Sequence, residues 1–419
     1  MSAMSFYGCD VAKLAEEYGT PLYVVSEDYI RERCREMKSD FLDKYENTKA
    51  VYASKAFQVL EVLRIVKSEG LGLDVVSGGE LYAALQAGFD PELIEFHGNS
   101  KSTQELKEAL DAGVGTIVVD NLSELSLLDE LAGGAGRVQS VLLRVTPGVD
   151  SHTHEYISTG QLDSKFGFAV EEILGGVAKQ AQESPNIDLR GFHYHVGSQL
   201  HDNSSHIMAT EIILDMLAQL KEDIGYEARE INCGGGFGVH YAGDPERTTV
   251  SYFMDPVMEK IDAFCKEKGL ARPTVTIEPG RWVVGEAGIT VYEVGSVKTN
   301  AAGRTYIGID GGFPDNPRPA LYDAKYEVEA VEKKDEPYDQ KVTIAGKCCE
   351  SGDILAWDVM LPELKRGEHI AVLCTGAYNH SMASNYNRVP KPGVVMVSQG
   401  KARLAAKKET YADMIHLEL

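Results

Sequence analysis

The sequence predicts an α/β protein, a parallel (β/α)8 barrel of the TIM type followed by an all-β domain. Short apolar segments alternate with helical periods up to about residue 280, and beyond about residue 285 strand-like segments follow one another with few helical patterns between them. A chain of 419 residues also exceeds the usual size of one domain. We expect the barrel at residues 27–284 and the β domain at residues 1–26 and 285–419.

Eight apolar segments predict the barrel strands. They are short and rich in Val, Ile and Leu, as in strands buried on both faces, and they lie at residues 50–54, 72–77, 94–98, 116–120, 140–145, 191–196, 230–233 and 274–278. Helical periods separate them at residues 59–68, 79–87, 104–112, 123–131, 170–181, 207–224 and 252–268. A doubly wound sheet is the alternative, but it should have a Gly-rich turn after its first strand, where this chain has Lys55.

Both flanks of the barrel contain strand patterns. Residues 21–26 read as a strand, and Ser26 is a plausible N-cap for an amphipathic helix that runs to about Phe41. The later strand patterns, several of them alternating, lie at residues 289–297, 305–309, 326–331, 341–345, 369–374 and 394–397. The early strand could join the sheet of this second domain.

Composition excludes several classes of function. The formal net charge of −23 disfavours nucleic acids and anionic membranes as partners, and no apolar run is long enough to span a bilayer. The N-terminus lacks a basic region followed by an apolar core, and seven scattered cysteines argue against a disulfide framework. We expect a soluble, cytoplasmic protein that acts on a small molecule.

The first predicted barrel strand ends at Lys55, in the stretch Tyr52-Ala53-Ser54-Lys55-Ala56. A lysine where a buried strand enters a loop is unusual, because burial disfavours the ammonium form and favours an amine that attacks carbonyl groups. The alternative is a surface lysine at a strand end, and so short a stretch does not decide between the two. Active sites of barrels lie at the C-terminal ends of the strands, so the other strand ends test the idea.

Strand seven is followed by the loop Gly234-Gly235-Gly236-Phe237-Gly238, and strand eight by Glu278-Pro279-Gly280-Arg281. Glycines leave backbone N–H groups unshielded and permit positive φ, which together make a nest for an anion. Taken alone, such a loop is equally well explained as a tight turn. Barrels commonly hold phosphate after strand seven, so this position, close to Arg281, favours a phosphate site.

Strand six carries His193 and His195, which we expect on one face because side chains alternate along a strand. Such histidines are more often core residues, and a zinc site is a further alternative, although no third ligand with suitable spacing follows. A flat imidazole at the barrel mouth could instead stack on a planar ring. Glu278 is either an ion-pair partner or, opposite a pyridine-type nitrogen, the group that keeps that nitrogen protonated.

A lysine amine, a phosphate nest, a stacking histidine and a pyridinium partner together specify pyridoxal 5′-phosphate, held on Lys55 as a Schiff base. The second domain adds three polar segments that a barrel alone would lack: Arg318-Pro319-Ala320-Leu321-Tyr322, Cys348-Cys349-Glu350-Ser351-Gly352-Asp353 and Gly376-Ala377-Tyr378. Adjacent cysteines could be a mere apolar pair. A thiol beside a carboxylate nevertheless suits proton transfer and ammonium binding better than packing.

With these motifs in this order, the chain resembles the diaminopimelate decarboxylase family, which pairs an alanine-racemase-like barrel with a β domain. The resemblance runs from about Pro21 to near the C-terminus. Besides the segments already quoted it rests on Thr159-Gly160, Asp163-Ser164-Lys165-Phe166-Gly167-Phe168 and the run His195-Val196-Gly197-Ser198-Gln199. The Arg-Pro-Ala-Leu-Tyr and Cys-Glu-Ser-x-Asp segments point to this family rather than to ornithine, arginine or carboxynorspermidine decarboxylases.

The resemblance implies a role at the cofactor for several residues. Lys55 would carry the pyridoxal 5′-phosphate, His195 would stack on its ring, and Glu278 would face its ring nitrogen. The remaining cofactor-binding positions, most of them around the phosphate, would be Gly235, Gly236, Pro279, Gly280, Arg281 and Tyr378.

The resemblance also implies how the substrate is held. Arg281, Arg318 and Tyr322 would bind the carboxylate at its non-reacting end, Glu350 would pair with the ammonium group there, and Tyr378 would touch substrate as well as cofactor. Cys349 would donate the proton, although the sequence does not exclude Cys348. In the family this cysteine and glutamate reach the site from the partner subunit, so the active unit would be a homodimer.

The implied reaction is decarboxylation of meso-2,6-diaminoheptanedioate to L-lysine and CO2, the last step of lysine biosynthesis. A related decarboxylase acting on another basic amino acid or on carboxynorspermidine is the alternative. A non-catalytic pyridoxal-phosphate carrier is disfavoured by the length, the β domain and the Cys-Glu loop. An acidic scaffold for protein partners has only the charge of −23 in its support, and a solvated surface explains that charge more simply.

Overall fold

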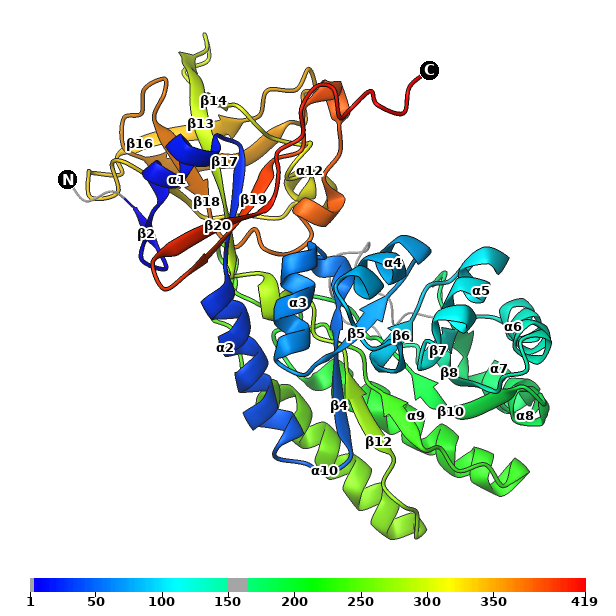
Figure 1. The fold of residues 1–419 in the computed structure, drawn as a ribbon. Coiled ribbons are helices and arrows are strands. Elements are labelled where there is room, and N and C mark those ends of the chain that lie inside the picture. Colours follow the sequence, from blue (N-terminus) through cyan, green and yellow to red (C-terminus); the bar gives the residue numbers. More distant parts are fainter. Residues whose placement is uncertain (1–3, 150–163) are drawn as a thin grey trace. The chain divides into compact units, whose positions relative to one another are not determined.

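The computed structural model describes residues 4–149 and 164–419, and the chain divides into two compact units (Figure 1). The first, which we call the barrel unit, comprises Arg33–Gly238 and Arg247–Trp282. The second, the β unit, comprises Met1–Glu32, Val239–Glu246 and Val283–Leu419.

Eight parallel strands of the described barrel unit form a closed sheet, which confirms the predicted barrel. They are β4 (Thr48–Ala53), β5 (Gly72–Val75), β6 (Ile94–Phe96), β7 (Thr116–Val119), β8 (Gln139–Thr146), β10 (Ile187–His193), β11 (Glu230–Asn232) and β12 (Thr274–Ile277). The sheet closes because β12 pairs with β4 and β10 pairs with β8. A short strand, β9 (Phe168–Ala169), pairs with β8 outside the ring.

The register of the barrel strands brings polar residues together. Asp74 of β5 lies opposite Glu95 of β6, and His193 of β10 lies opposite Asn232 of β11. All four side chains are buried. Buried polar groups need partners, so these residues must be satisfied by one another or by a ligand.

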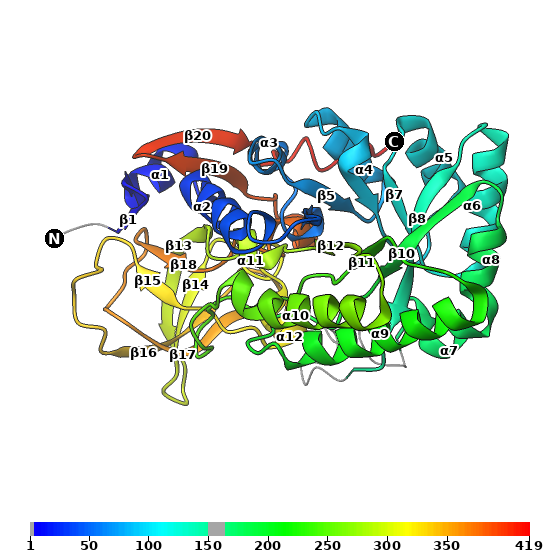
Figure 2. The same ribbon diagram turned by 90° about the horizontal axis from the view of Figure 1, so that it is seen from below.

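Helices follow the strands in the predicted alternation and lie outside the barrel (Figure 1). They are α3 (Leu60–Ser68), α4 (Gly78–Gln86), α5 (Thr103–Ala112), α6 (Leu122–Gly134), α7 (Val170–Glu172), α8 (Ala178–Glu183), α9 (Ser204–Ile224) and α10 (Val250–Lys268). Local sequence explains their ends: Ser102 and Glu105 form a capping box at the start of α5, and Gly113 ends it in a left-handed conformation. Figure 2 shows α9 and α10 packed side by side. No helix of the described residues is long and apolar enough to cross a membrane.

The β unit contains a sheet in the strand order β17-β16-β14-β13-β3-β19-β20. Its strands are β3 (Leu22–Ser26), β13 (Gly288–Thr299), β14 (Thr305–Ile309), β16 (Gln340–Ala345), β17 (Ile354–Leu361), β19 (Gly393–Ser398) and β20 (Lys401–Ala406). Two further strands lie outside this order: β18 (His369–Val372) pairs with β13, and β15 (Val328–Ala330) pairs with β18. The early strand β3 pairs with β13 and β19, as expected. Ser26 accepts the N–H of Tyr29 at 3.1 Å at the start of α2 (Glu27–Met37), which continues as a π-helical turn, Lys38–Leu42.

Two strands of this sheet, β17 and β20, were not predicted. In β17 two consecutive residues, Trp357 and Asp358, are exposed and the pairing with β16 shifts register, so the alternation that identifies a strand is broken. The sequence of β20, Lys-Ala-Arg-Leu-Ala-Ala, has little strand preference, and the strand lies at the sheet edge, where charged residues are common.

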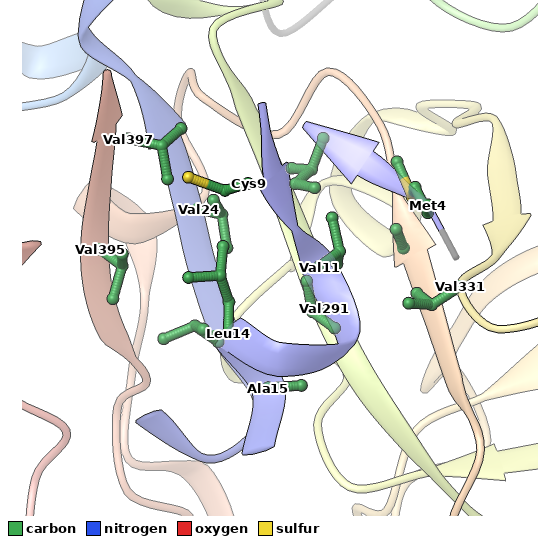
Figure 3. Packing of buried hydrophobic residues seen from close by; sticks show 13 residues of the cluster. Met4, Cys9, Val11, Leu14, Ala15, Val24, Val291, Val331, Val395 and Val397 are labelled. Carbon is green, nitrogen blue, oxygen red and sulfur yellow. The ribbon is translucent and has the colours of Figure 1, made fainter. Parts of the chain in front are cut away.

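A compact apolar cluster supports the N-terminal part of the β unit (Figure 3). It joins β1 (Ser5–Phe6), β2 (Cys9–Asp10) and α1 (Val11–Tyr18) to the sheet through buried residues that include Val11, Leu14, Val24, Val291 and Val395. The sheet strands carry β-branched residues, and α1 carries Leu and Ala on its buried side. Burial of these apolar faces holds the N-terminal segment, from β1 to α1, against the sheet. The cysteines of the described residues form no disulfide.

Candidate active site

Lys55 lies in a single 3-10 turn, Ser54–Ala56, directly after β4. The turn is held by the Tyr52 hydroxyl, which donates to the Phe57 carbonyl at 2.9 Å, and by the Ser54 hydroxyl, which donates to Glu80 at 3.2 Å. Ser54 and Ala56 are buried, but the side chain of Lys55 is exposed. The burial expected for Lys55 from its place at the end of a buried strand is therefore not observed, although its two neighbours are buried.

The loop after β12 lies against the strand that carries Lys55. The Ala53 N–H donates to the Pro279 carbonyl at 3.2 Å. A Cβ atom on Gly280 would lie 3.0 Å from the Cβ of Ala53, so a larger residue would push the two segments apart. Strands one and eight of the barrel thus present Lys55 and the segment Glu278-Pro279-Gly280-Arg281 at the same strand ends.

Glu278 is a buried carboxylate held on both oxygens. Its Oε2 lies 3.1 Å from His193 Nε2, and its Oε1 lies 2.9 Å from His97 Nε2 and accepts from Asn232 Nδ2 at 2.7 Å. Burial would raise the pKa of this carboxyl, but the neighbouring His97 and His193 hold the pKa well below its usual range. Glu278 is therefore an anion at neutral pH.

His195 follows the end of β10 and lies on a loop, so strand alternation no longer relates it to His193. Its Nδ1 accepts the N–H of Gly235 at 3.3 Å, which places the ring proton on Nε2. Burial, and then Lys55, lower the pKa of this imidazole well below its usual range. His195 is thus a neutral, planar ring fixed against the Gly-rich loop.

The Gly-rich loop after β11 is crowded, and this is why it contains glycines. A Cβ atom on Gly235 would lie 2.2 Å from the Glu278 carbonyl, and one on Gly236, whose φ is +99°, would lie 2.3 Å from the Gly197 carbonyl. The N–H groups of Gly236 and Phe237 have no hydrogen-bond partner within the described residues. Arg281 is buried near this region and donates to Ser198 at 3.1 Å. Loop and guanidinium therefore offer donors suited to a phosphate group.

Only His193 of the two histidines considered as zinc ligands lies in a cluster of metal-ligand residue types among the described residues. Ligand-type atoms of His97, His193 and Glu278 lie within 4.8 Å of one another, so the companions of His193 come from the ends of other strands and not from the segment that directly follows it. His97 comes from another strand, which sequence spacing could not show. The two oxygens of Glu278 lie 2.9 Å from His97 and 3.1 Å from His193, which are distances of ion pairs and hydrogen bonds.

Arg318 is buried in the β unit among tyrosines. It opens α12 (Arg318–Tyr322), and its Nη1 donates to Tyr241 at 2.8 Å and to Tyr326 at 3.3 Å. Its guanidinium carbon lies 5.9 Å from the ring centre of Tyr322 and 6.0 Å from that of Tyr378. The structure therefore brings Arg318, Tyr322 and Tyr378 together within the β unit.

Cys349 and Glu350 lie on an exposed loop of the β unit. The backbone is fixed by Asp353, which accepts the N–H of Cys348 at 2.8 Å, and by Asn387, which accepts the N–H of Cys349 at 2.7 Å. Burial, and then Asp353, raise the pKa of the Cys348 thiol to about 12. No hydrogen bond or ion pair of the described residues joins Cys349 or Glu350 to Arg318.

Comparison with known proteins identifies the family. Residues 27–285 match the model of the pyridoxal-dependent decarboxylase, pyridoxal binding domain. The chain is 47% identical to the diaminopimelate decarboxylase of Bacillus subtilis over 98% of this chain and 94% of that protein, and 43% identical to that of Staphylococcus aureus over 97% and 96%. The chain belongs to the diaminopimelate decarboxylase family.

Solved structures of the family have the same fold. The diaminopimelate decarboxylase of M. jannaschii in complex with L-lysine superimposes with a TM-score of 0.91 at 36% identity, covering 98% of this chain and 94% of that one. The Helicobacter pylori enzyme, also complexed with L-lysine, gives 0.89 at 31% identity, with 97% and 99% covered. Both cover the barrel unit and the β unit.

The barrel unit fits the pyridoxal group that the family uses. An anionic carboxylate, a neutral planar imidazole, an exposed amine and a glycine loop with donor N–H groups lie at the ends of neighbouring strands. These are the chemical groups that a pyridine nitrogen, its ring face, an aldehyde and a phosphate require.

Several residues that contribute to the site were not predicted from the strand ends, and Asn232, which donates to Glu278, is one of them. His97 follows β6, Arg144 lies on β8, and Glu80 binds the turn of Lys55 from α4. His97 and Arg144 lie at or near the ends of barrel strands three and five, so their positions in the sequence carry the same signal as those of the predicted site residues. Of the family segments, Thr159, Gly160 and Asp163 lie outside the described residues, whereas Gly167 donates its N–H to Asp120 at 2.9 Å.

Proposed function

We propose that this member of the family catalyses the pyridoxal 5′-phosphate-dependent decarboxylation of meso-2,6-diaminoheptanedioate to L-lysine and CO2. The observation that carries the proposal is the fixed Glu278 anion beside the strand that ends at Lys55, in a chain 47% identical to a diaminopimelate decarboxylase. Two related structures carry L-lysine, the product of this reaction, in their complexes.

Each predicted cofactor-binding residue of the barrel unit would have a specific role. When bound, pyridoxal 5′-phosphate supplies a pyridinium ring that accepts the electron pair left as CO2 departs. The Lys55 amine would hold the cofactor aldehyde and exchange with the substrate amine, and the Glu278 carboxylate would keep a proton on the ring nitrogen. His195 would cover one ring face, because a neutral imidazole stacks without adding charge. The loop at Gly235 and Gly236, together with Arg281, would bind the phosphate.

The β unit would select the substrate. Arg318 presents a buried guanidinium, whose planar donors suit a carboxylate, and Tyr322 lies beside it. We propose that Arg281 and Arg318 bind the carboxylate that is not lost and that Glu350 pairs with the ammonium group at the same end. A substrate with an amino-acid group at each end satisfies both requirements, whereas ornithine lacks the second carboxylate. Tyr378 would touch both cofactor and substrate.

We propose that Cys349 delivers the proton that replaces CO2 and that it acts in the site of a partner subunit. Its exposure, and that of Glu350, supports this arrangement, because a proton donor used within its own chain would be expected against its substrate-binding residues. Cys348 is less suited, because its amide is tied to Asp353 and its thiol lies beside that carboxylate. The functional unit would be a cytoplasmic homodimer.

Release of CO2 from meso-2,6-diaminoheptanedioate by the purified protein, with and without added cofactor, tests the proposal. We expect cofactor-dependent release of CO2 and formation of L-lysine, with ornithine and arginine as poor substrates. Release of CO2 from ornithine or arginine but not from meso-2,6-diaminoheptanedioate would instead assign a different substrate to the same cofactor chemistry.

A further inference from the structure

Glu278 has more partners than a carboxylate needs to face one ring nitrogen. His97, His193 and Asn232 contact its two oxygens at 2.9, 3.1 and 2.7 Å. The rings of His97 and His193 meet edge to face with centroids 4.9 Å apart. The carboxylate therefore has one orientation within the barrel.

We propose that His97 is a positioning residue that acts through Glu278 to hold the cofactor ring nitrogen in its protonated state. The proposal rests on the proposed function only in requiring a pyridine-type cofactor over Glu278, and not on the identity of the substrate. His97 touches no reacting atom, so it is not a catalytic residue in the strict sense.

The charges around His97 explain why it rather than His193 supplies the positive charge. His97 Nε2 lies 3.8 Å from Asp74 of β5 and 3.8 Å from Glu95 of β6, in addition to Glu278. Burial alone would lower the pKa of His97, but these carboxylates outweigh it and raise the pKa to about 10. Burial lowers the pKa of His193 to about 4, so His193 is neutral.

Other charged groups face the same cluster from the remaining elements. Arg144 of β8 interacts electrostatically with Asp74 and Glu278, and the Lys55 ammonium interacts with Asp74 and His195. Burial raises the pKa of Asp74 to about 6. With His97 charged, Glu278 is an anion next to a cation rather than one of three neighbouring carboxylates. Removal of the imidazolium would leave Asp74, Glu95 and Glu278 to repel one another, which favours protonation of Glu278. A protonated Glu278 does not stabilise a pyridinium ring.

Asn232 fixes the geometry of this cluster and links it to the Gly-rich loop. Its Oδ1 accepts the N–H of Gly234 at 2.9 Å, so its Nδ2 must face the carboxylates. That nitrogen donates to Glu278 at 2.7 Å and to Glu95 at 2.8 Å. One amide thus separates two carboxylates and connects the ring-nitrogen partner to the proposed phosphate loop.

His97→Asn tests the proposal in holoenzyme reconstituted with pyridoxal 5′-phosphate labelled with 15N in the ring. We expect a protonated ring nitrogen in the wild type and a shift of its 15N resonance toward the unprotonated form in His97→Asn. We also expect kcat to fall roughly tenfold to 100-fold, as when residues that orient a ligating group are removed, with KM changed less than about threefold. His369→Asn is the control, because this half-buried histidine of the β unit also pairs with a glutamate, Glu332.

A cofactor analogue with carbon in place of the ring nitrogen separates positioning from a structural role. If His97 acts through the ring nitrogen, wild type and His97→Asn should have the same kcat with this analogue. An equal loss of kcat with both cofactors, or an unchanged 15N resonance, would overturn the proposal. Failure of the wild type to bind pyridoxal 5′-phosphate would overturn the proposed function as well.

Loss of a buried cation could prevent folding, and a double variant keeps the proposal testable in that case. Asp74→Asn/His97→Asn removes the cation together with one of its anions, so the net charge of the cluster is preserved. We expect this variant to bind cofactor and to show the same shift of the ring-nitrogen resonance. A wild-type resonance in the folded double variant would contradict the role of His97.

Discussion

Glu278 and Glu350 are both carboxylates of the candidate site, yet their surroundings are opposite. Glu278 is buried in the barrel unit and has His97, His193 and Asn232 as partners. Glu350 is exposed in the β unit, and the hydrogen bond of its side chain within the described residues is to the N–H of Gly352, two residues away, at 3.2 Å.

Under the proposed function, this difference separates the residues that bind the cofactor within one chain from those that act in the site of a partner subunit. The cofactor residues are oriented by their own barrel, because strand ends converge there and buried charges must be paired. The loop of Cys349 and Glu350 has a fixed backbone but exposed side chains, which the proposed homodimer would explain. The barrel would therefore bind cofactor in a single chain, whereas turnover would need two.

The largest effect is expected from Lys55→Ala, which tests the proposed cofactor site of the barrel unit. We expect CO2 release to fall by about 10⁴-fold or more, because the variant loses the amine proposed to hold the cofactor aldehyde. The visible absorption of bound cofactor should change with it. Lys107→Ala, on the exposed side of α5, is the control and should leave both unchanged. A Lys55→Ala protein with normal colour and activity would remove the basis of the cofactor assignment.

Arg318→Ala tests the substrate-binding half. We expect kcat/KM for meso-2,6-diaminoheptanedioate to fall roughly 1,000-fold, because a buried charge pair loses one member. Activity on a substrate without a second carboxylate should change much less. Arg318→Lys should recover only part of the loss, since an ammonium group cannot form the bidentate contact. Equal losses on both kinds of substrate would show that Arg318 does not recognise the carboxylate.

Cys349→Ala tests the exposed loop and should lower kcat about 100-fold, as loss of a proton donor does. Cys348→Ala should lower it less than about threefold. Thiol labelling near pH 8 should be faster at Cys349, because Cys349 is exposed and the pKa of Cys348 is raised to about 12. The opposite order in both measurements would make Cys348 the donor.

Mixing Lys55→Ala and Cys349→Ala subunits tests whether Cys349 acts in its own chain or in the site of a partner subunit. If Cys349 acts in the partner's site, each mixed dimer contains one intact site, and random exchange should restore about a quarter of the wild-type activity. If Cys349 serves its own chain, no intact site forms and no activity should return. Each variant incubated alone is the control.

The smallest effect is expected from Tyr326→Phe. This change removes the more distant of two hydroxyl groups that hold Arg318, at 3.3 Å against 2.8 Å for Tyr241. We expect KM for meso-2,6-diaminoheptanedioate to rise about threefold to tenfold with little change in kcat, in line with the loss of one hydrogen bond. Tyr411→Phe, on an exposed segment, should have no effect. An unchanged KM in Tyr326→Phe would mean that Tyr241 alone positions the arginine.

The barrel was predictable because its signals are local. Each strand is a short apolar segment, each helix has its own caps, and the order of the segments is the order of the barrel. The strand β17 was missed because two adjacent exposed residues and a register shift interrupt its pattern. The lysine, the histidine and the glycine loop could be found because each lies next to the end of a recognisable strand.

The sequence by itself determined the fold class, the family and the chemical types of the cofactor residues, since these depend on motifs and periodicity within single segments. Tertiary structure alone decided which residues charge and orient one another. His97 and Asn232 come from β-strand ends far from Glu278 in the chain, and only closure of the barrel brings them to its two oxygens. Packing also decided that Lys55 is exposed while its neighbours Ser54 and Ala56 are buried. Ionisation depends on distances between charges and on burial, and neither is encoded in the spacing of one segment.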